Sequence, residues 1–342
     1  VIRTEKPQTF HQALQLFWLY ALVAGVINYG RMDDVLGPFL QSDLDNGILD
    51  EEEALNSIVV PKEIEGKKVT VISNLSGAYM VEQIVLPNTV ITVEDWAFDG
   101  CWILKELYVS ESVEYLYGFP NEGVSLGNIN VIVAENNKTF ASKDGALYSK
   151  DMTKLFYVPE GYEGVYEMPS TLVSMSEEAL DYCMSITEIV IPTSFTKWTA
   201  CVGLESLEKI KVEEGNSIYC SENNILFSKD KTKLVKIPAN AIGTEYVIPE
   251  TVKEIDEYAF SDCDSLTVVT ISKNVSIGSK SETIGNSTFE YKGQNYFKDC
   301  VSLQGIEVVE ENPNYIAKDG ILFTKDMKTL AFLSFIDKPF CS

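Results

Sequence analysis

The segment Ile255-Asp-Glu-Tyr-Ala-Phe-Ser-Asp-Cys263-Asp-Ser-Leu266-Thr-Val-Val-Thr-Ile271 decides the fold of this chain. Apolar residues stand at positions 266, 269 and 271, so the segment ends in the pattern apolar-x-x-apolar-x-apolar. Alternation in the last three positions is typical of a β-strand that buries one face. A cysteine lies three residues ahead of the first apolar position, and an Ala-Phe pair precedes the cysteine. The segment therefore predicts a short strand with one inward face.

The same pattern returns along the chain from about Ile58 onward, and this repetition predicts a solenoid. A cysteine precedes four of the strands at the same distance, as Cys101, Cys183, Cys263 and Cys300. One unit cannot bury its apolar stripe alone, so stacked units bury it jointly in one elongated core. The apolar triplets are Val81/Ile84/Leu86, Leu104/Leu107/Val109, Ile186/Ile189/Ile191, Leu207/Ile210/Val212, Leu266/Val269/Ile271 and Leu303/Ile306/Val308.

A second module is interleaved with these units in three copies. Residues 140–155 read FASKDGALYSKDMTKL, residues 219–234 read YCSENNILFSKDKTKL, and residues 315–330 read YIAKDGILFTKDMKTL. Asp-Gly and Asn-Asn are tight-turn dipeptides, and the Lys-Asp pair in each copy marks a second turn. We interpret each copy as a small β-hairpin inserted between solenoid turns.

This combination resembles the BspA-like class of leucine-rich repeats over roughly 280 residues, in a motif such as Ile255 to Leu266. The resemblance implies a mainly β leucine-rich repeat solenoid over residues 58–342, incomplete at its C-terminus. It also implies an extracellular or cell-surface location, because such repeats are common on bacterial surfaces. The polar stretch Asn274–Lys292 interrupts the pattern, and we interpret it as a loop.

Residues 1–57 read differently and predict a short α-helical segment. Thr9 and Gln12 form a capping box, and apolar residues follow at three- and four-residue spacing up to Ala24. This segment resembles an internal stretch of glycyl radical enzymes, the family that includes pyruvate formate-lyase. The stretches that carry the resemblance are TFHQALQLFW at 9–18, YGRMDD at 29–34 and DLDNGILDEEEA at 43–54.

Two sharper interpretations of these residues are less favoured, and the chain carries no convincing signal peptide. Arg3 and Lys6 precede an apolar run, as in a signal peptide, but the family resemblance runs straight through that run. The acidic stretch from Asp43 does not match a calcium loop, because Ile48 and Ala54 stand where the loop needs Gly and Glu. Glycyl radical chemistry uses a mid-chain cysteine and a C-terminal glycine loop, which this chain does not match. The resemblance therefore transfers no catalytic residue, and we expect no enzyme.

Charge and composition exclude several classes of function. With 27 Lys and Arg against 51 Asp and Glu, the chain carries a net charge of −24. Phosphate backbones and anionic membrane surfaces both need clustered cations, so we expect neither nucleic acid nor membrane insertion. His11 is the single histidine, and no Cys-x-x-Cys pair occurs among the seven cysteines. We expect no metal and no cofactor, and we interpret the repeat cysteines as an inward ladder of small side chains. Cys201, Cys220 and Cys341 lie outside that ladder.

The remaining hypothesis is a monomeric, non-catalytic adhesion protein that binds a protein or glycan. Leucine-rich repeat proteins often bind ligands on the sheet face, through residues between the apolar positions. Two alternatives stay open: a truncated or fused relative of a glycyl radical enzyme, and structural spacer repeats. The candidate face residues are Glu106, Tyr108, Glu188, Val190, Lys209, Lys211, Val268 and Thr270.

Overall fold

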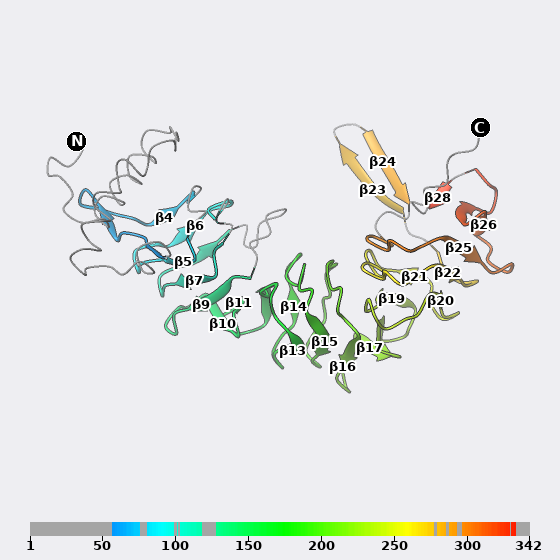
Figure 1. Cartoon of the computed structure of the whole chain (residues 1–342), viewed down its shortest axis with the longest axis horizontal. Coiled ribbons are helices and arrows are strands. Elements are labelled where there is room, and N and C mark those ends of the chain that lie inside the picture. The colour runs from blue at the N-terminus through cyan, green and yellow to red at the C-terminus, as the bar shows by residue number, and fades with distance from the viewer. Residues whose placement is uncertain are drawn as a thin grey trace. The chain divides into compact units, whose positions relative to one another are not determined.

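A computed structural model of the chain describes residues 57–75, 81–98, 101, 103–117, 128–276, 279–284, 287–292, 296–328 and 330–332. Strands and turns make up the regular structure of these residues, and none of them lies in a helix (Figure 1). The helices predicted within residues 1–57 fall outside the described residues. The chain divides into two compact units, Val1–Gly145 and Ala146–Ser342. The repeat region thus extends over both units, and the boundary falls inside the first hairpin module.

Unit 1 contains two parallel sheets, with strand orders β1-β5-β7-β9 and β4-β6-β8, and an antiparallel pair β2-β3. Within the larger sheet, Ile84, Leu107 and Val131 lie opposite one another and are buried, as the predicted inward positions require. The strands are β1 (Ser57–Val59), β2 (Glu63–Ile64), β3 (Lys67–Lys68), β4 (Val71–Ile72), β5 (Gln83–Val85), β6 (Thr92–Val93), β7 (Glu106–Val109), β8 (Tyr115–Leu116), β9 (Asn130–Val133) and β10 (Phe140–Lys143).

Unit 2 repeats this arrangement with parallel sheets β13-β15-β16 and β20-β22-β25. The inward positions Ile189 and Ile210, and likewise Val269 and Ile306, face each other across neighbouring strands and are buried. The strands are β11 (Ala146–Ser149), β12 (Lys154–Tyr157), β13 (Gly164–Glu167), β14 (Ser174–Met175), β15 (Ile186–Ile191), β16 (Lys209–Val212), β17 (Tyr219–Glu222), β18 (Ile225–Ser228), β19 (Lys233–Lys236), β20 (Glu245–Val247), β21 (Glu254–Ile255), β22 (Val268–Ile271), β23 (Ser279–Ile284), β24 (Ser287–Lys292), β25 (Gly305–Val308), β26 (Tyr315–Lys318), β27 (Ile321–Thr324) and β28 (Leu330–Phe332).

The hairpin modules have the predicted turns and one further strand. In the second copy β17 pairs antiparallel with β18, β18 pairs antiparallel with β19, and β19 then pairs parallel with β21. The third strand of the module is therefore also a strand of the solenoid, which the sequence pattern alone did not indicate. The tip of the hairpin covers the edge of the preceding parallel sheet, because the Asn224 carbonyl accepts a hydrogen bond from Ile210 N at 2.9 Å. Gly145 and Gly320 accept the equivalent bonds from Val131 and Ile306.

A buried asparagine stands at the entry to each module. The side-chain amide of Asn216 donates to the carbonyls of Pro192 at 2.8 Å and Phe195 at 2.9 Å. Its Oδ1 accepts the backbone N–H groups of Ile218 and Tyr219 at 2.9 and 2.8 Å. One side chain thus satisfies four backbone groups and joins two successive turns. Asn137 and Asn312 make the same four kinds of bond.

The interpretation of Asn274–Lys292 as a loop is wrong. Residues Ser279–Ile284 and Ser287–Lys292 form an antiparallel pair, β23 and β24, in register over six residue pairs. The stretch is polar and lacks an apolar period, so it gave no strand signal in the sequence. Its strands pair through their backbones, and that pairing does not require an apolar face.

The repeat cysteines occupy the predicted ladder, with one qualification. Cys101, Cys183 and Cys263 are buried, whereas Cys300 is partly exposed. The thiols donate hydrogen bonds to backbone carbonyls, as Cys183 does to Val158 at 3.7 Å, so they are polar ties as well as small packing groups. Of the three cysteines outside the ladder, Cys201 is buried, Cys220 donates to the Ser228 carbonyl at 3.3 Å, and Cys341 falls outside the described residues.

Candidate functional site

The candidate face residues alternate with the buried positions, so their side chains leave the core. Glu106, Tyr108, Glu188, Val190, Lys209, Val268 and Thr270 are partly exposed, and Lys211 is exposed. They belong to three separate parallel sheets, one in unit 1 and two in unit 2. The structure therefore brings them together as local groups, each on its own sheet.

In unit 1 the outer face carries a continuous row of hydrogen-bonded side chains. Ser57 Oγ donates to Gln83 Oε1 at 3.1 Å, and Gln83 Nε2 donates to Glu106 Oε2 at 2.7 Å. Tyr108, two residues along the same strand, donates its hydroxyl to the same Glu106 oxygen at 3.0 Å. The row crosses β1, β5 and β7 because Ser57, Gln83 and Glu106 are register partners. The strand pattern predicts Glu106 and Tyr108 on this face, whereas their link to Ser57 depends on the register between strands, which the sequence does not show.

These contacts fix both charge and orientation in the row. The hydrogen bond to Glu106 raises the pKa of Tyr108 above its ordinary value, and burial and the nearby carboxylate charge add to the effect. The phenol therefore stays neutral at physiological pH. A hydrogen-bonded row presents its remaining donors and acceptors in fixed directions, which lowers the entropy lost on binding a polar partner.

In unit 2 the first parallel sheet pairs opposite charges. Lys209 Nζ lies 3.0 Å from Glu188 Oε1, and the two residues are register partners on β16 and β15. Val190 faces Lys211 one step further along the same two strands. Because the Glu188–Lys209 pair is half-exposed, it contributes little to stability, and its charge is compensated locally.

The second parallel sheet of unit 2 carries the weakest candidate group. Val268 pairs with Gly305, and Thr270 pairs with Glu307, whose Oε2 lies 3.5 Å from the Thr270 hydroxyl. A shallow groove nearby, of about 420 Å³, has the salt-bridged residues Glu250 and Lys273 in its lining. Ser272 also lines the groove, and its hydroxyl donates to the Pro249 carbonyl at 3.2 Å.

The smaller sheet of unit 1 carries an aromatic pair that was not predicted from the sequence. Tyr115 and Tyr117 are 48% and 52% exposed. Their rings stack with centroids 5.8 Å apart and an interplanar angle of 10°. Trp96 is also half-exposed. The sequence contained the signal for this pair, because a strand places residues two positions apart on the same face.

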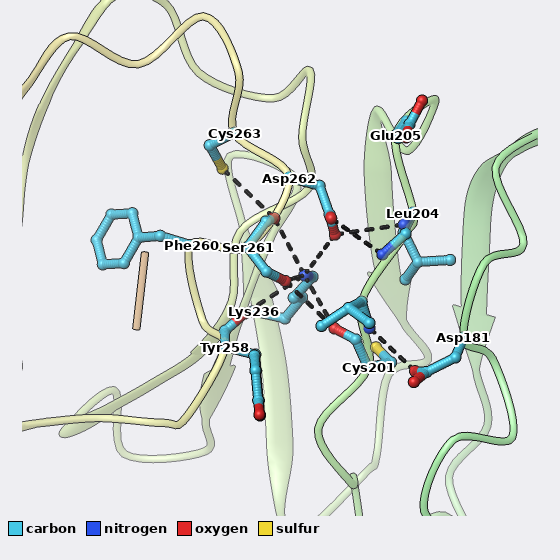
Figure 2. Close-up of polar contacts among 12 residues, drawn as sticks. Asp181, Cys201, Leu204, Glu205, Lys236, Tyr258, Phe260, Ser261, Asp262 and Cys263 are labelled. Carbon is cyan, nitrogen blue, oxygen red and sulfur yellow. Dashed lines mark hydrogen bonds and ion pairs between the residues drawn. The ribbon is translucent and has the colours of Figure 1, made fainter. Parts of the chain in front are cut away.

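A buried polar cluster in unit 2 is the chemically most unusual feature of the described residues. Lys236 Nζ lies 3.5 Å from Asp262 Oδ2 and hydrogen bonds with Ser261 Oγ (Figure 2). It also donates to the carbonyls of Cys201 at 3.4 Å and Ser261 at 3.3 Å. The Asp262 carboxylate accepts the backbone N–H groups of Gly203 and Leu204 at 2.9 and 3.3 Å. Every charged atom of the cluster thus has a partner, as burial of charge demands.

The cluster does not form an active site. A lysine beside a serine hydroxyl can activate a nucleophile, but Lys236 is 1% and Ser261 0% exposed. No substrate can reach either atom in this structure. The cluster instead ties residues 201–204 to residues 258–262, across two repeat units. In addition, no group of three or more potential metal-ligating side chains occurs within the described parts of the chain.

A comparison with known families identifies the family of the repeats. The family described as "BspA type leucine rich repeat region" matches this chain in six copies, at residues 50–161, 164–245 and 239–337. The chain belongs to the BspA type leucine rich repeat family. The leucine-rich repeat solenoid expected from sequence is thereby confirmed. Among the described residues, no helix is both long and apolar enough to cross a membrane.

The solved structures that resemble this chain include leucine-rich repeat proteins from bacteria. A leucine rich cell surface protein from Faecalibacterium prausnitzii is 20% identical, with a TM-score of 0.46 over 74% of this BspA type chain and 59% of that protein. A leucine-rich repeat protein from Eubacterium ventriosum is 18% identical, with a TM-score of 0.43 over 74% of this chain and 68% of the other.

The first residues of the chain match a different family. Residues 1–59 match the pyruvate formate lyase-like family, as the sequence resemblance indicated. A trans-4-hydroxy-L-proline dehydratase from Clostridioides difficile is 39% identical over 61 residues, which are 16% of this chain and 8% of the dehydratase. The chain thus spans less than a tenth of the length of that curated relative.

Proposed function

We propose that this protein is a non-catalytic binding protein of a bacterial cell surface that recognises a macromolecular partner through the outer face of β1, β5 and β7. The observation that carries the proposal is the row Ser57–Gln83–Glu106–Tyr108. Its side chains contribute an amide, a carboxylate and a phenol on the outer side of a rigid sheet. Side chains already held in place lose little freedom when a partner binds, which favours affinity.

The chemistry of this row suits a hydroxyl-rich partner, so a glycan is the first partner to test. The amide, carboxylate and phenol oxygens offer acceptors for sugar hydroxyls, because the Tyr108 hydroxyl already donates its hydrogen to Glu106 Oε2. The raised pKa of Tyr108 keeps this phenol protonated at physiological pH. The net charge of −24 opposes anionic glycans over a long range, which directs the search toward neutral or cationic chains. The exposed pair Tyr115 and Tyr117 offers a rival surface in the same unit.

Binding of the full chain to an array of neutral, cationic and anionic glycans, and to immobilised extracellular proteins, tests the proposal. We expect a neutral or cationic glycan to bind, and the double variant Glu106→Ala/Tyr108→Phe to weaken that binding about tenfold or more. Lys231→Ala, on an exposed hairpin turn of unit 2, is the matched control and leaves affinity unchanged.

Other outcomes of the same experiment separate the alternatives. Loss of binding in Tyr115→Ala/Tyr117→Ala, but not in the Glu106/Tyr108 variant, moves the site to the aromatic pair. Loss in Lys211→Glu alone moves it to unit 2. If neither array retains the wild-type chain, the partner-binding proposal is wrong and the spacer hypothesis gains support.

A further inference from the structure

Two ladder cysteines of unit 2 occupy equivalent positions in neighbouring turns. Strand β22 pairs parallel with β25, and Val268 lies opposite Gly305. Cys263 and Cys300 each precede these partners by five residues. Neighbouring parallel strands lie about 4.8 Å apart. Equivalent positions in stacked turns therefore bring the two Cα atoms into the range of roughly 4.4–6.8 Å that a disulfide spans.

The segments that carry the two cysteines are also tied directly to each other. Phe260 N donates to the Tyr296 carbonyl at 3.0 Å, and Asp262 N donates to the Lys298 carbonyl at 3.2 Å. The Phe260 and Phe297 rings pack with centroids 4.8 Å apart. The Phe260 carbonyl accepts both Cys263 N at 3.3 Å and Cys300 Sγ at 2.9 Å, so the Cys300 thiol reaches the backbone beside Cys263. A bond between the sulfurs thus requires little backbone movement.

When this pair is oxidised, each carbonyl that had accepted a thiol hydrogen keeps another hydrogen-bond donor. The Phe260 carbonyl now accepts from Cys300 Sγ at 2.9 Å, but it also accepts from Cys263 N at 3.3 Å. The Ser261 carbonyl accepts weakly from Cys263 Sγ and keeps its bond from Lys236 Nζ. The usual penalty for unsatisfied buried groups therefore does not oppose a disulfide.

The other register partners of these ladder positions are not cysteines. Glu188 pairs with Lys209, so the same five-residue offset places Cys183 opposite Leu204. On the other side of Cys263, the register of Glu245 with Val268 brings Asn240 to the equivalent position. Cys263 and Cys300 thus form a matched pair that these neighbouring turns lack.

Among the parallel strand pairs that the structure describes, the strands that follow this pair are separated by the widest interval in sequence. Val268 and Gly305 are 37 residues apart, whereas Val165 and Glu188, or Gln83 and Glu106, are 23 apart. The additional residues contain the β23–β24 hairpin. The entropy of closing a loop rises with its length, so this junction gains most from a covalent tie.

We propose that Cys263 and Cys300 form a reversible disulfide that fastens the two turns on either side of the β23–β24 hairpin. The oxidant is a low-molecular-weight disulfide. The partly exposed Cys300 attacks it as a thiolate, forms a mixed disulfide and releases one small thiol. Cys263 then attacks the Cys300 sulfur and releases the second small thiol. Two protein thiols are oxidised to one disulfide while one small disulfide is reduced to two thiols.

The second step sets the pH dependence of the reaction. In the reduced pair, its hydrogen bond with Cys300, followed by burial, raises the pKa of the Cys263 thiol well above its ordinary value. Cys263 stays buried when Cys300 is in the mixed disulfide, and burial still disfavours its thiolate. The attacking thiolate of Cys263 is therefore scarce near neutral pH. We expect closure to accelerate as pH rises from 7 to 9, while the mixed disulfide is the species that accumulates at the lower pH.

Oxidised glutathione and peptide mapping of the full chain test the proposal. After treatment at pH 8.5 and before alkylation, we expect a mass lower by about 2 Da than that of the reduced chain, and alkylation should then label two cysteines fewer than in the reduced chain. Tryptic peptide 254–273 should then be linked to peptide 299–318, and each contains one cysteine. The chain with the disulfide should unfold at a temperature higher than that of the reduced chain by several degrees, on the order of 5 °C, and dithiothreitol should reverse the shift.

Two variants control the measurement. Cys300→Ser removes the partly exposed thiol and should abolish both the linked peptide and the temperature shift. Cys220→Ser removes another partly exposed thiol and should change neither. The proposal is overturned if Cys300 stays as a glutathione adduct at pH 8.5, if both thiols are alkylated, or if the link involves other cysteines.

Discussion

At the scale of single residues, the repeat region depends on side chains that satisfy backbone groups of the neighbouring turn. Asn137, Asn216 and Asn312 do this at the entry to each hairpin module. The signal was available in the sequence, because each asparagine stands three residues ahead of the aromatic residue that begins the module. Sequence analysis missed it because asparagine is common in turns for reasons that need no burial.

Asn216→Ala should destabilise the protein by about 2–4 kcal/mol, since it leaves two carbonyls and two N–H groups of the core without their partner. Urea unfolding followed by circular dichroism measures the loss. Asn314→Ala, at an exposed position, is the control and should change stability by no more than about 0.5 kcal/mol. Equal losses in the two variants would show that the buried hydrogen bonds of Asn216 contribute nothing.

The buried pair Lys236 and Asp262 could not have been predicted from sequence, since it joins residues of two different repeat units. The aligned modules do show that Lys236 replaces Tyr157, an inward aromatic residue of the first copy. A lysine in that place requires an acceptor, but the sequence does not say which acidic residue supplies it. The structure identifies Asp262, which also caps the N–H groups of Gly203 and Leu204.

Lys236→Met should destabilise by about 3–5 kcal/mol, because it leaves the Asp262 carboxylate buried without a counter-charge. The double variant Lys236→Met/Asp262→Asn should lose less than the sum of its two single variants, since neither charge remains unpaired. Denaturant unfolding of all four chains gives the coupling. The half-exposed pair Glu188 and Lys209 is the matched control, with a coupling below about 1 kcal/mol. Additive losses at Lys236 and Asp262 would contradict this account.

At the scale of elements, sequence periodicity predicted most of what the structure describes. The apolar triplets gave the inward residues of β7, β15, β16, β22 and β25, and turn dipeptides gave the hairpins. The third hairpin strand, which pairs with both β18 and β21, was missed because the module pattern indicated only a two-stranded hairpin. The β23–β24 pair was missed because polar strands carry no apolar period. The candidate face was predicted residue by residue, but its hydrogen-bonded row depends on the register between turns.

Substitutions at a hairpin tip can test whether the turn requires a residue that adopts positive φ. Asn224 has φ +70°, and the equivalent Gly145 and Gly320 both have φ +79°. Asn224→Gly should hold or raise stability by up to about 0.5 kcal/mol, because glycine adopts this conformation without strain. Asn224→Val should lower stability by about 1–2 kcal/mol, because a β-branched residue opposes positive φ. Thermal unfolding of the three chains orders them, and a valine variant as stable as wild type would contradict the turn assignment.

At the scale of the whole chain, two families meet near residue 57. The pyruvate formate lyase-like match covers residues 1–59, and the BspA type repeats cover most of the chain from residue 50 onward. The described buried clusters of unit 2 draw only on residues of that unit. Repeat proteins gain stability from each unit and its nearest neighbours, so a solenoid tolerates the loss of distant sequence.

Residues 58–342, expressed alone, should therefore fold into a β-rich monomer with a cooperative thermal transition. This fragment carries 24 basic and 42 acidic residues, a net charge of −18, which favours solubility. Far-ultraviolet circular dichroism, size-exclusion chromatography with light scattering, and a thermal scan beside the full chain make the test. Cleavage by a protease at low concentration is the control for loosely packed structure. An aggregated or gradually melting fragment would show that the repeats require the formate lyase-like segment in order to fold.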